Sequence, residues 1–399
     1  MWSKNIHFNC LSLRKPQIVN HYEFNSELTT KDKLFLNMNE FCESNKSNVF
    51  DYLPLTFVFD TSSKDYCNFL QQFFQIFRSL EQIENTEQGS SINKANKIIS
   101  FFYPTKPKSF TKPKLWDSQI GSNIWIIKPT GFNRGRGVSV FSDLITLKKL
   151  INEFVGNEET NYFSHMIELN KNRSSIIKSK KFVIQKYIEK PLLYRGRKFD
   201  MRMWVLIDQE MKVYLFKEGY LRTSVKEYSL ESNLLKDKAT HLTNNAVQKN
   251  MKGYGKYEEG NQVSLKSFQE YLDEIHSNIS LRNNLFLQME KLISMSCKSV
   301  KNKINANQRE FQFEIFGYDF INDKNFKVWL IEVNTTPCLE ESSNILKMLL
   351  PRMLNDAFSL TINKVFKESI YENQKNIYEV EGYDNHENLW DFICDLKLG

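Results

Sequence analysis

Hydrophobic residues recur along the chain with two different periods, which predict helices in some segments and strands in others. Residues 66–80 place aromatic and aliphatic side chains three or four positions apart, a spacing that predicts one amphipathic helix packed on a core. From residue 123 onward, short runs of β-branched and aromatic residues predict strands. The run 123–129, a glycine-rich segment and the run 138–141 predict a β-hairpin closed over a loop.

The rest of the chain continues this mixture of strands and helices. Further strands are expected at 182–188, 201–208, 212–221, 313–321 and 326–334, the last two as an antiparallel pair. Further helices are expected at 147–155, from residue 267 onward, at 285–300 and at 344–366. Such an alternation is typical of an α+β protein.

Polar stretches suggest where the chain divides. The Asn- and Ser-rich stretch 81–97 and two copies of the tetrapeptide TKPK suggest a loop or linker. We therefore expect a separate amino-terminal α/β unit with its linker at 1–120, a core at 121–366 with a polar insertion at about 157–181, and a polar tail at 367–399.

Composition narrows the class of protein. The chain has 399 residues, of which 41% are hydrophobic and 25% charged, so it is long enough for two or three compact units. It lacks the roughly 18 consecutive apolar residues of a membrane-spanning helix, and its first residues mix charge with amide groups, so neither membrane insertion nor secretion is expected. Six scattered cysteines without a CxxC pair indicate reduced cytosolic thiols. The net charge of +7 is compatible with an acidic partner without naming one.

The glycine-rich segment GFNRGRG could bind an anion. Gly135 and Gly137, with Arg136 between them, would let backbone N–H groups approach a phosphate, and Lys128 at the end of the preceding strand could neutralise its charge. The segment lacks the Gly-Lys-Ser/Thr ending of a P-loop, and the run after it reads as a strand. An ordinary flexible hairpin turn is the alternative.

A second group of polar residues lies on the late strand pair. Glu332 and Asn334 are two positions apart, so their side chains point to one face, and Asp319 is expected at a similar depth on the neighbouring strand. Three oxygen donors in an apolar setting suit Mg²⁺. The alternative is a set of surface carboxylates on an edge strand.

A third group alternates along the run RKFDMRMWVLI. Lys198, Asp200 and Arg202 share one face of the strand, and Arg222 on the next strand can join them. Paired guanidinium groups suit a carboxylate or a transferring phosphoryl group. A structural salt bridge between Asp200 and an arginine is the competing interpretation. His241, in HLTNN, reads as a hydrogen-bonded core histidine and receives no catalytic role.

Six ordered motifs between about 123 and 339 resemble the tubulin tyrosine ligase family, which has an ATP-grasp fold. They are RKFDMRMWVLI, YLFKEGYLRTS, HLTNN, YGKYEEGN, FGYDF and VWLIEVN. The resemblance implies two α+β subdomains that hold ATP between them, and an ATP-dependent ligase that joins an amino acid to the glutamate-rich carboxy-terminal tail of tubulin through an acyl phosphate. Free amino acid, ATP and Mg²⁺ would be the small reactants and cofactor, and no nucleic acid is expected.

The same resemblance assigns roles to individual residues. Arg202 and Arg222 would orient the acyl phosphate and the acceptor carboxylate, and Asp319, Glu332 and Asn334 would bind magnesium. The adenine, phosphates and amino acid would lie against Lys128, Gln185, Lys186, Ile188, Lys198, Asp200, Thr243 and Asn244.

The added amino acid is expected to be tyrosine, by a narrow margin. The residues after Arg222 and the YGKYEEGN segment are closer to the tyrosine-adding members, whereas the polar insertion and the NTTPCL segment are closer to those that add glycine or glutamate. Two other classes stay open: a non-catalytic microtubule-binding relative, which would have lost some of these ligands, and a ligase for small peptides. Expected locations are the cytoplasm, microtubules and the cilium.

Overall fold

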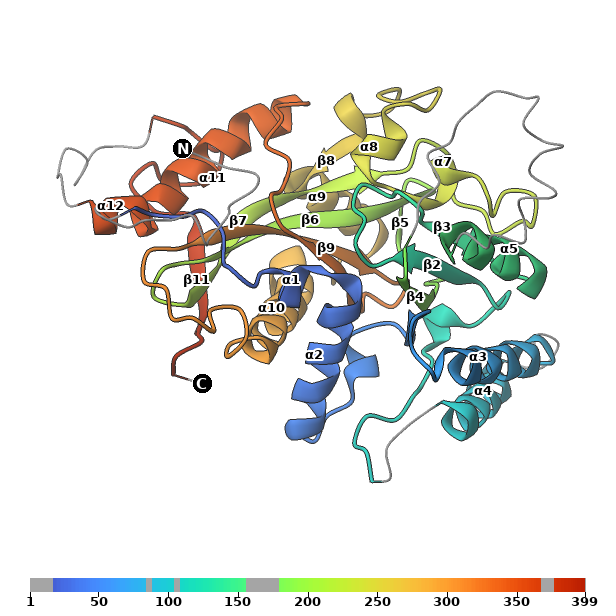
Figure 1. The fold of residues 1–399 in the computed structure, drawn as a ribbon. Coiled ribbons are helices and arrows are strands. Elements are labelled where there is room, and N and C mark those ends of the chain that lie inside the picture. The colour runs from blue at the N-terminus through green and yellow to red at the C-terminus, as the bar shows by residue number, and fades with distance from the viewer. Residues whose placement is uncertain (1–16, 84–87, 104–107, 156–178, 367–376, 399) are drawn as a thin grey trace, which may run out of the picture.

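The computed structural model describes residues 17–83, 88–103, 108–155, 179–366 and 377–398. Within these ranges the chain forms two mainly antiparallel sheets flanked by helices, the α+β arrangement expected of an ATP-grasp fold (Figure 1). None of the described helices is long and apolar enough to cross a bilayer. The five described cysteines are free thiols.

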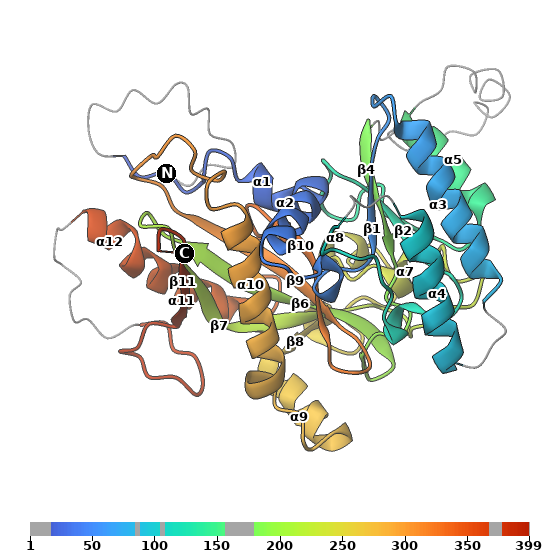
Figure 2. The same ribbon diagram turned by 90° about the horizontal axis from the view of Figure 1, so that it is seen from below.

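The small sheet has four strands in the order β1-β4-β2-β3. Its strands are β1 (Thr56–Asp60), β2 (Trp125–Pro129), β3 (Ser139–Phe141) and β4 (Lys181–Lys186). The predicted hairpin is confirmed, because β2 pairs antiparallel with β3 and Trp125 lies opposite Phe141. Three helices flank this sheet on the side away from the large sheet (Figure 2): α3 (Tyr66–Glu81), α4 (Gln88–Phe102) and α5 (Leu144–Val155).

The large sheet has seven strands, five of them in the order β10-β9-β6-β7-β11. In chain order they are β5 (Leu193–Tyr194), β6 (Arg197–Ile207), β7 (Lys212–Thr223), β8 (Gln262–Ser264), β9 (Glu314–Asn322), β10 (Val328–Asn334) and β11 (Trp390–Asp395). Strand β6 lies at its centre and is buried along its whole length. A central strand of this kind holds its side chains in fixed positions on both faces.

Helices cover both faces of the large sheet (Figures 1 and 2). On one face lie α11 (Asn344–Leu360) and the short α12 (Ile362–Val365), where the single expected helix at 344–366 is divided at Thr361. The other face carries α2 (Lys31–Ser44), α9 (Leu265–Ile275) and α10 (Leu287–Ser299). Short helices α1 (Ser26–Thr29), α7 (Lys238–His241) and α8 (Asn245–Gln248) connect these layers.

Strand β6 changes chemistry along one of its faces. Trp204 and Leu206 pack in the apolar cluster under α11, while Lys198, Asp200 and Arg202 at the other end of the same face are buried polar residues. The opposite face carries methionine and phenylalanine packed in the main core. This face of the large sheet therefore forms a polar site at one end of β6 and part of an apolar core at the other end.

Two segments expected to be irregular belong to the folded structure. Residues 88–102 form helix α4, because Ala95 and Ile99, four positions apart, are buried in the main core that also holds α3. The expected tail at 367–399 contains β11, which pairs antiparallel with β7 and places Trp390 opposite Phe216. The polar insertion at about 157–181 lies outside the described residues except for its last three positions, where β4 begins.

The described residues before position 121 pair with both sheets. Strand β1 pairs with β4 in the small sheet, so that Phe59 stacks on Phe182 with ring centroids 5.2 Å apart. On the large sheet, the buried carboxylate of Glu314 accepts hydrogen bonds from the backbone N–H of Tyr22 at 2.8 Å and from Asn25 Nδ2 at 3.0 Å. The amino-terminal segment is thus bonded to both sheets.

Candidate functional site

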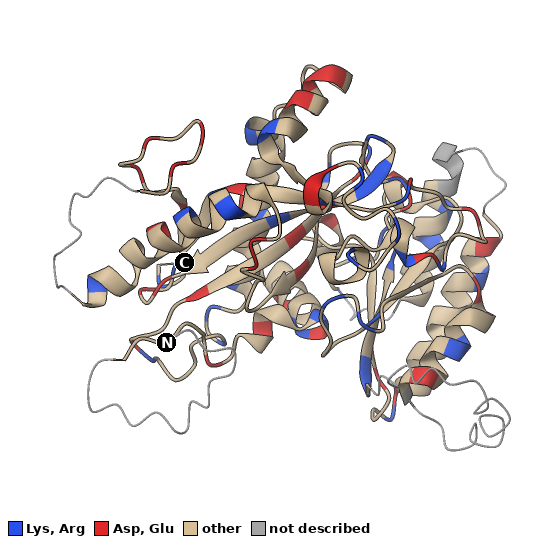
Figure 3. Cartoon of the chain, turned by 90° about the horizontal axis from the view of Figure 1, so that it is seen from above, with Lys and Arg blue, Asp and Glu red and all other residues tan. Residues whose placement is uncertain are grey.

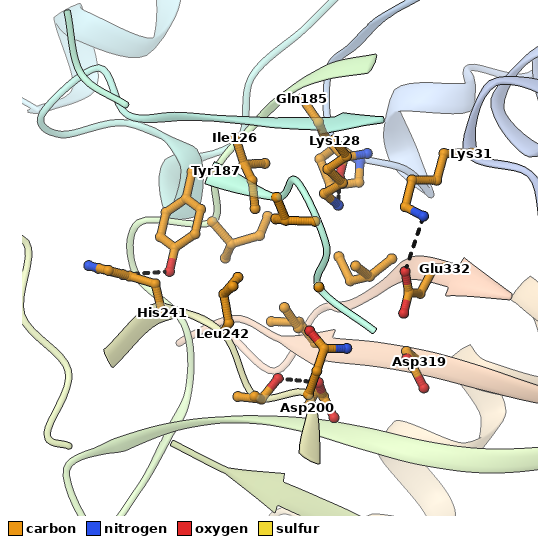
Figure 4. A pocket seen from close by; sticks show the side chains of 18 of the residues that line it. Lys31, Ile126, Lys128, Gln185, Tyr187, Asp200, His241, Leu242, Asp319 and Glu332 are labelled. Atoms are coloured by element: carbon orange, nitrogen blue, oxygen red, sulfur yellow. Dashed lines mark hydrogen bonds and ion pairs between the residues drawn. The ribbon is translucent and has the colours of Figure 1, made fainter. Parts of the chain in front are cut away.

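A cavity lies where the two sheets meet, and most of the residues predicted for the site line it. Figure 4 shows an apolar end around Ile126, Tyr187 and Leu242 and a charged end around Lys128, Asp319 and Glu332. Predicted residues along its wall are Lys128, Gly135, Gln185, Lys186, Ile188, Lys198, Asp200, Thr243, Asn244, Asp319 and Glu332. Figure 3 shows Lys and Arg segments (blue) and Asp and Glu segments (red) close together near the middle of the molecule.

The small sheet holds Lys128 on the cavity wall. Its Nζ donates to Gln185 Oε1 at 2.8 Å, and Gln185 Nε2 in turn donates to Thr56 Oγ1 of β1 at 2.9 Å. Burial lowers the pKa of Lys128 to about 8, an effect that Glu332 opposes and a neighbouring lysine increases. In the described part of the chain this ammonium group forms no ion pair with a carboxylate.

The large sheet supplies a second buried lysine. Lys198 Nζ donates to the hydroxyl of Tyr187 at 2.8 Å and to the backbone oxygen of His241 at 3.0 Å. Burial lowers the pKa of Lys198 to about 7, although Asp200 raises it in part. The His241 ring bonds to the Tyr187 hydroxyl at 3.0 Å, and burial lowers the pKa of His241 to about 4, so it is a neutral core histidine, as expected.

Two arginines and two aspartates form a continuous chain of ion pairs. Arg202 Nε lies 2.5 Å from Asp319 Oδ1, Arg222 Nη2 lies 2.7 Å from Asp319 Oδ2, and Arg222 Nε lies 2.6 Å from Asp200 Oδ1. Thr243 donates a further hydrogen bond to Asp200. Burial alone would raise the pKa of Asp319, but the two guanidinium groups outweigh burial and hold this pKa well below its usual value. The salt bridge between Asp200 and an arginine, which was the competing interpretation, therefore exists, and it lies inside the predicted site.

Glycine at position 317 makes room for one of these arginines. A Cβ atom there would lie 3.2 Å from atoms of the Arg202 guanidinium group, closer than ordinary van der Waals contact. Gly317 faces Trp204 across the β6–β9 pair and precedes Asp319 by two positions. The motif FGYDF contains this glycine, but its contact with Arg202 is visible only in the folded chain.

The carboxylate edge has the geometry expected from the sequence. Glu332 and Asp319 face each other in the β9–β10 register, and Asn334 Nδ2 lies 3.2 Å from both Glu332 Oε1 and Asp319 Oδ2. The two carboxylates offer oxygen ligands, which fit a hard divalent cation such as Mg²⁺, and Asn334 would add a third through its amide oxygen in place of the nitrogen that faces the carboxylates here. Among the described residues, no group of three or more His, Cys, Asp and Glu side chains could hold a metal ion. A metal site at this edge would therefore need the Asn334 amide as its third ligand.

Some predicted residues lie beside the cavity and do not line it. Arg202, Arg222 and Asn334 contact the lining carboxylates without being lining residues themselves. Arg136 is exposed, with its guanidinium group 5.4 Å from the centre of the Phe132 ring, and neither it nor Gly137 lines the wall. The φ of Gly135 is +70°, and a Cβ there would lie 2.9 Å from Val247 Cγ2, so this position requires glycine.

The side chain of Lys186 is engaged in a structural pair. Its ammonium group is ion-paired with the buried Glu189 and donates to the backbone oxygen of Ile124 at 2.7 Å. Lys186 therefore contributes to the wall of the cavity, but its charge is already neutralised, unlike that of Lys128 or Lys198.

Two contributions to the cavity are not predicted by the sequence motifs. Tyr187 and Leu242 form its apolar end together with Ile126, and Lys31 from α2 enters its charged end. Lys31 is about 300 positions from Glu332 along the chain, and no local pattern connects them. Tyr187 lies in the run FVIQKYI at 182–188, which predicts a strand but does not mark Tyr187 as a cavity residue.

Comparison with known proteins agrees with the motifs. The profile of the family described as "Tubulin-tyrosine ligase family" matches residues 11–370. Tubulin glycylase 3B of Tetrahymena thermophila is 30% identical over 273 residues, which are 68% of this chain and 21% of that protein. Tubulin glycylase 3A of Drosophila melanogaster is 33% identical over 61% of this chain and 22% of its own length.

A shorter relative is covered more completely. The "Probable alpha-tubulin polyglutamylase Ttll1" of Tetrahymena thermophila is 27% identical over 373 residues, 91% of this chain and 76% of that protein. The chain thus spans about a fifth of the length of the glycylases and three quarters of this relative. Because the family profile covers most of the 399 residues, the chain belongs to the tubulin-tyrosine ligase family.

Proposed function

We propose that the protein is an ATP-dependent ligase that joins the amine of an amino acid to a glutamate carboxylate of tubulin. The observation that carries this proposal is the pair of buried lysines, Lys128 and Lys198, which lack carboxylate partners among the described residues and face an edge of oxygen donors across one cavity. Burying unpaired ammonium groups is unfavourable, and a polyphosphate would neutralise both.

The two ends of the cavity suit the two ends of ATP. The apolar end, with Ile126, Tyr187 and Leu242, fits a base, while the lysines and carboxylates fit phosphates. A magnesium ion bound by Asp319, Glu332 and Asn334 would supply positive charge at the phosphates. In that arrangement the arginine–aspartate chain fixes two guanidinium groups beside the reacting carboxylate.

The proposed reaction has two steps. An oxygen of the glutamate carboxylate attacks the terminal phosphorus of ATP, ADP leaves, and an acyl phosphate forms. The amine nitrogen of the amino acid then attacks the acyl carbon, phosphate leaves, and the nitrogen loses a proton to give the amide. Negative charge develops on the transferring phosphoryl group in the first step, and Arg202 and Arg222, which ion pairs with Asp319 and Asp200 position, would stabilise that charge.

We propose glycine as the added amino acid, in place of the tyrosine expected from the sequence. The relatives named above are two glycylases and a polyglutamylase, and they give no support to tyrosine. Glutamate is the second candidate. The polyglutamylase aligns with 91% of this chain, and the alignment covers 76% of its own length, against about a fifth for the two glycylases. Tubulin as partner, and action at microtubules in the cytoplasm or the cilium, belong to the same proposal.

One assay separates the candidates. Purified protein is incubated with tubulin, ATP and Mg²⁺ and with isotopically labelled glycine, glutamate or tyrosine in turn, and modified peptides are identified by mass spectrometry. We expect ATP-dependent addition of glycine to glutamate residues of the tubulin tail. Addition of glutamate would select the second candidate. Absence of any addition, from protein that is folded and binds tubulin, would instead favour a non-catalytic microtubule-binding protein.

A further inference from the structure

Glu314 is a buried carboxylate that does not line the cavity. It begins β9, is 1% exposed, and precedes Asp319 by five positions, so its side chain points to the opposite face of the large sheet. A carboxylate in such a place is unfavourable unless hydrogen bonds compensate for the lost hydration. The groups that contact Glu314 therefore indicate what this residue serves.

Those groups come from two segments that are distant along the chain. In the amino-terminal segment, His21 Nδ1 lies 3.0 Å from Glu314 Oε1, and the backbone N–H of Tyr22 donates to Glu314 Oε2 at 2.8 Å. Asn25 Nδ2 donates to Glu314 Oε1 at 3.0 Å. In the loop after β10, the hydroxyl of Thr335 donates to the same oxygen at 2.5 Å. Asn25 Nδ2 also donates to Thr335 Oγ1 at 3.2 Å, so the two segments contact each other as well as Glu314.

The loop after β10 is strained next to a proposed magnesium ligand. Thr335 directly follows Asn334, the third member of the carboxylate edge. The next residue, Thr336, has a φ of +51°, a left-handed conformation that a β-branched residue rarely adopts. Such a conformation persists where surrounding contacts hold it. The hydrogen bonds of Thr335 to Glu314 and Asn25 supply contacts of this kind.

We propose that Glu314 is a positioning residue for the magnesium site: through Thr335 it holds the strained turn, and the turn keeps the Asn334 amide at the carboxylate edge. The amino-terminal segment shares this task, because Asn25 bonds to both Glu314 and Thr335. This inference rests on the proposed function, since it assumes that Mg²⁺ binds at the carboxylate edge together with ATP.

The Mg²⁺ dependence of nucleotide binding tests the inference without any ligation. Binding of ATP to the whole protein, with no tubulin present, is measured by calorimetry over a series of free Mg²⁺ concentrations and again with EDTA. Glu314→Gln is expected to raise the Mg²⁺ concentration needed for tight ATP binding about tenfold or more, a loss typical of residues that orient metal ligands. With EDTA, the Kd of ATP should change by less than about twofold, because Glu314 does not line the cavity.

Control variants separate positioning from a general loss of stability. Asp356 is also buried, at 3% exposed, and pairs with Arg352 within α11. Asp356→Asn should lower the free energy of unfolding, measured by urea denaturation, without changing the Mg²⁺ requirement. Thr335→Val removes only the hydroxyl group and should raise the Mg²⁺ requirement as Glu314→Gln does. Thr335→Ser keeps the hydroxyl group and should bind ATP and Mg²⁺ nearly as the wild type does.

The outcomes separate this inference from the proposed function. A wild-type protein that binds no ATP would overturn the proposed function itself, and one that binds ATP without regard to Mg²⁺ would overturn its metal site. If ATP binding by the wild type depends on Mg²⁺, then an unchanged Mg²⁺ requirement in Glu314→Gln or in Thr335→Val would overturn the role of Glu314 alone. An equal loss of ATP affinity with Mg²⁺ and with EDTA would do the same. Should Glu314→Gln fail to fold, Thr335→Val and Thr335→Ser provide the comparison.

Discussion

Individual residues of the site were predictable where a local pattern carried the information. Alternation along β6 predicts that Lys198, Asp200 and Arg202 share one face, and alternation along β10 predicts that Glu332 lies beside Asn334. The structure confirms both placements. The place of Lys31 in the cavity wall could not be predicted, because it depends on a contact with Glu332 that only the folded chain creates. The family resemblance places Lys186 against the nucleotide, yet Glu189, three positions later, neutralises the charge of its side chain.

Replacing Glu332 tests the carboxylate edge. Glu332→Gln keeps the shape of the side chain but removes a negative charge from the proposed metal site, so the ligation rate should fall by roughly a hundredfold or more at saturating Mg²⁺. Tubulin binding, measured by co-sedimentation with microtubules, should stay nearly unchanged. Glu274→Gln, on the exposed surface of α9, serves as the control. Retained turnover in Glu332→Gln would refute the metal assignment.

The two buried lysines predict how nucleotide binding depends on pH. Without a ligand, burial holds the pKa of Lys128 at about 8 and of Lys198 at about 7, so both are partly neutral at about pH 8. Phosphates favour the charged form and raise both pKa values, so binding takes up protons and weakens as the pH rises above about 7. Calorimetry at about pH 8 in buffers of different ionisation enthalpy should detect this proton uptake, and Lys198→Met should reduce it. Binding without proton uptake would contradict the proposed contact between lysines and phosphate.

At the scale of elements, strongly periodic segments were predictable and polar ones were not. The helix expected at 66–80 is α3 (Tyr66–Glu81), because its apolar stripe is visible in the sequence alone. Helix α4 and strand β11 are stabilised by packing against partners elsewhere in the chain, and their own residues do not identify those partners. The division of the helix expected at 344–366 at Thr361 also escaped prediction.

Strand β11 should contribute to the stability of the large sheet. Trp390 is 5% exposed, packs against Phe216 with ring centroids 5.2 Å apart, and donates from Nε1 to the backbone oxygen of Met353 at 3.0 Å. Trp390→Ala should therefore lower the free energy of unfolding by about 3–5 kcal/mol, measured by urea denaturation. Phe392→Ala, on the same strand but 56% exposed, should cost less than about 1 kcal/mol. Equal, small effects of both substitutions would mean that β11 adds little to the fold.

At the scale of the whole molecule, the site exists because the two sheets and the amino-terminal segment meet. Strand β1 extends the small sheet, and the hydrogen bonds of Tyr22 and Asn25 to Glu314 attach the segment before α2 to the large sheet. The α+β class could be predicted from the order of helices and strands. The pairing of β1 with β4 could not be predicted, because pairing between strands more than 100 positions apart leaves no local trace.

The most direct test of the account follows the oxygen atoms of the acceptor carboxylate. A tubulin-tail peptide with ¹⁸O in its glutamate side chains is incubated with the protein, ATP, Mg²⁺ and glycine, and the phosphate released is analysed by mass spectrometry. If the carboxylate attacks the terminal phosphorus and phosphate later leaves the acyl carbon, each amide formed releases one phosphate that carries one ¹⁸O atom, together with one ADP. Amide formation accompanied by unlabelled phosphate, or by AMP and pyrophosphate, would contradict the account.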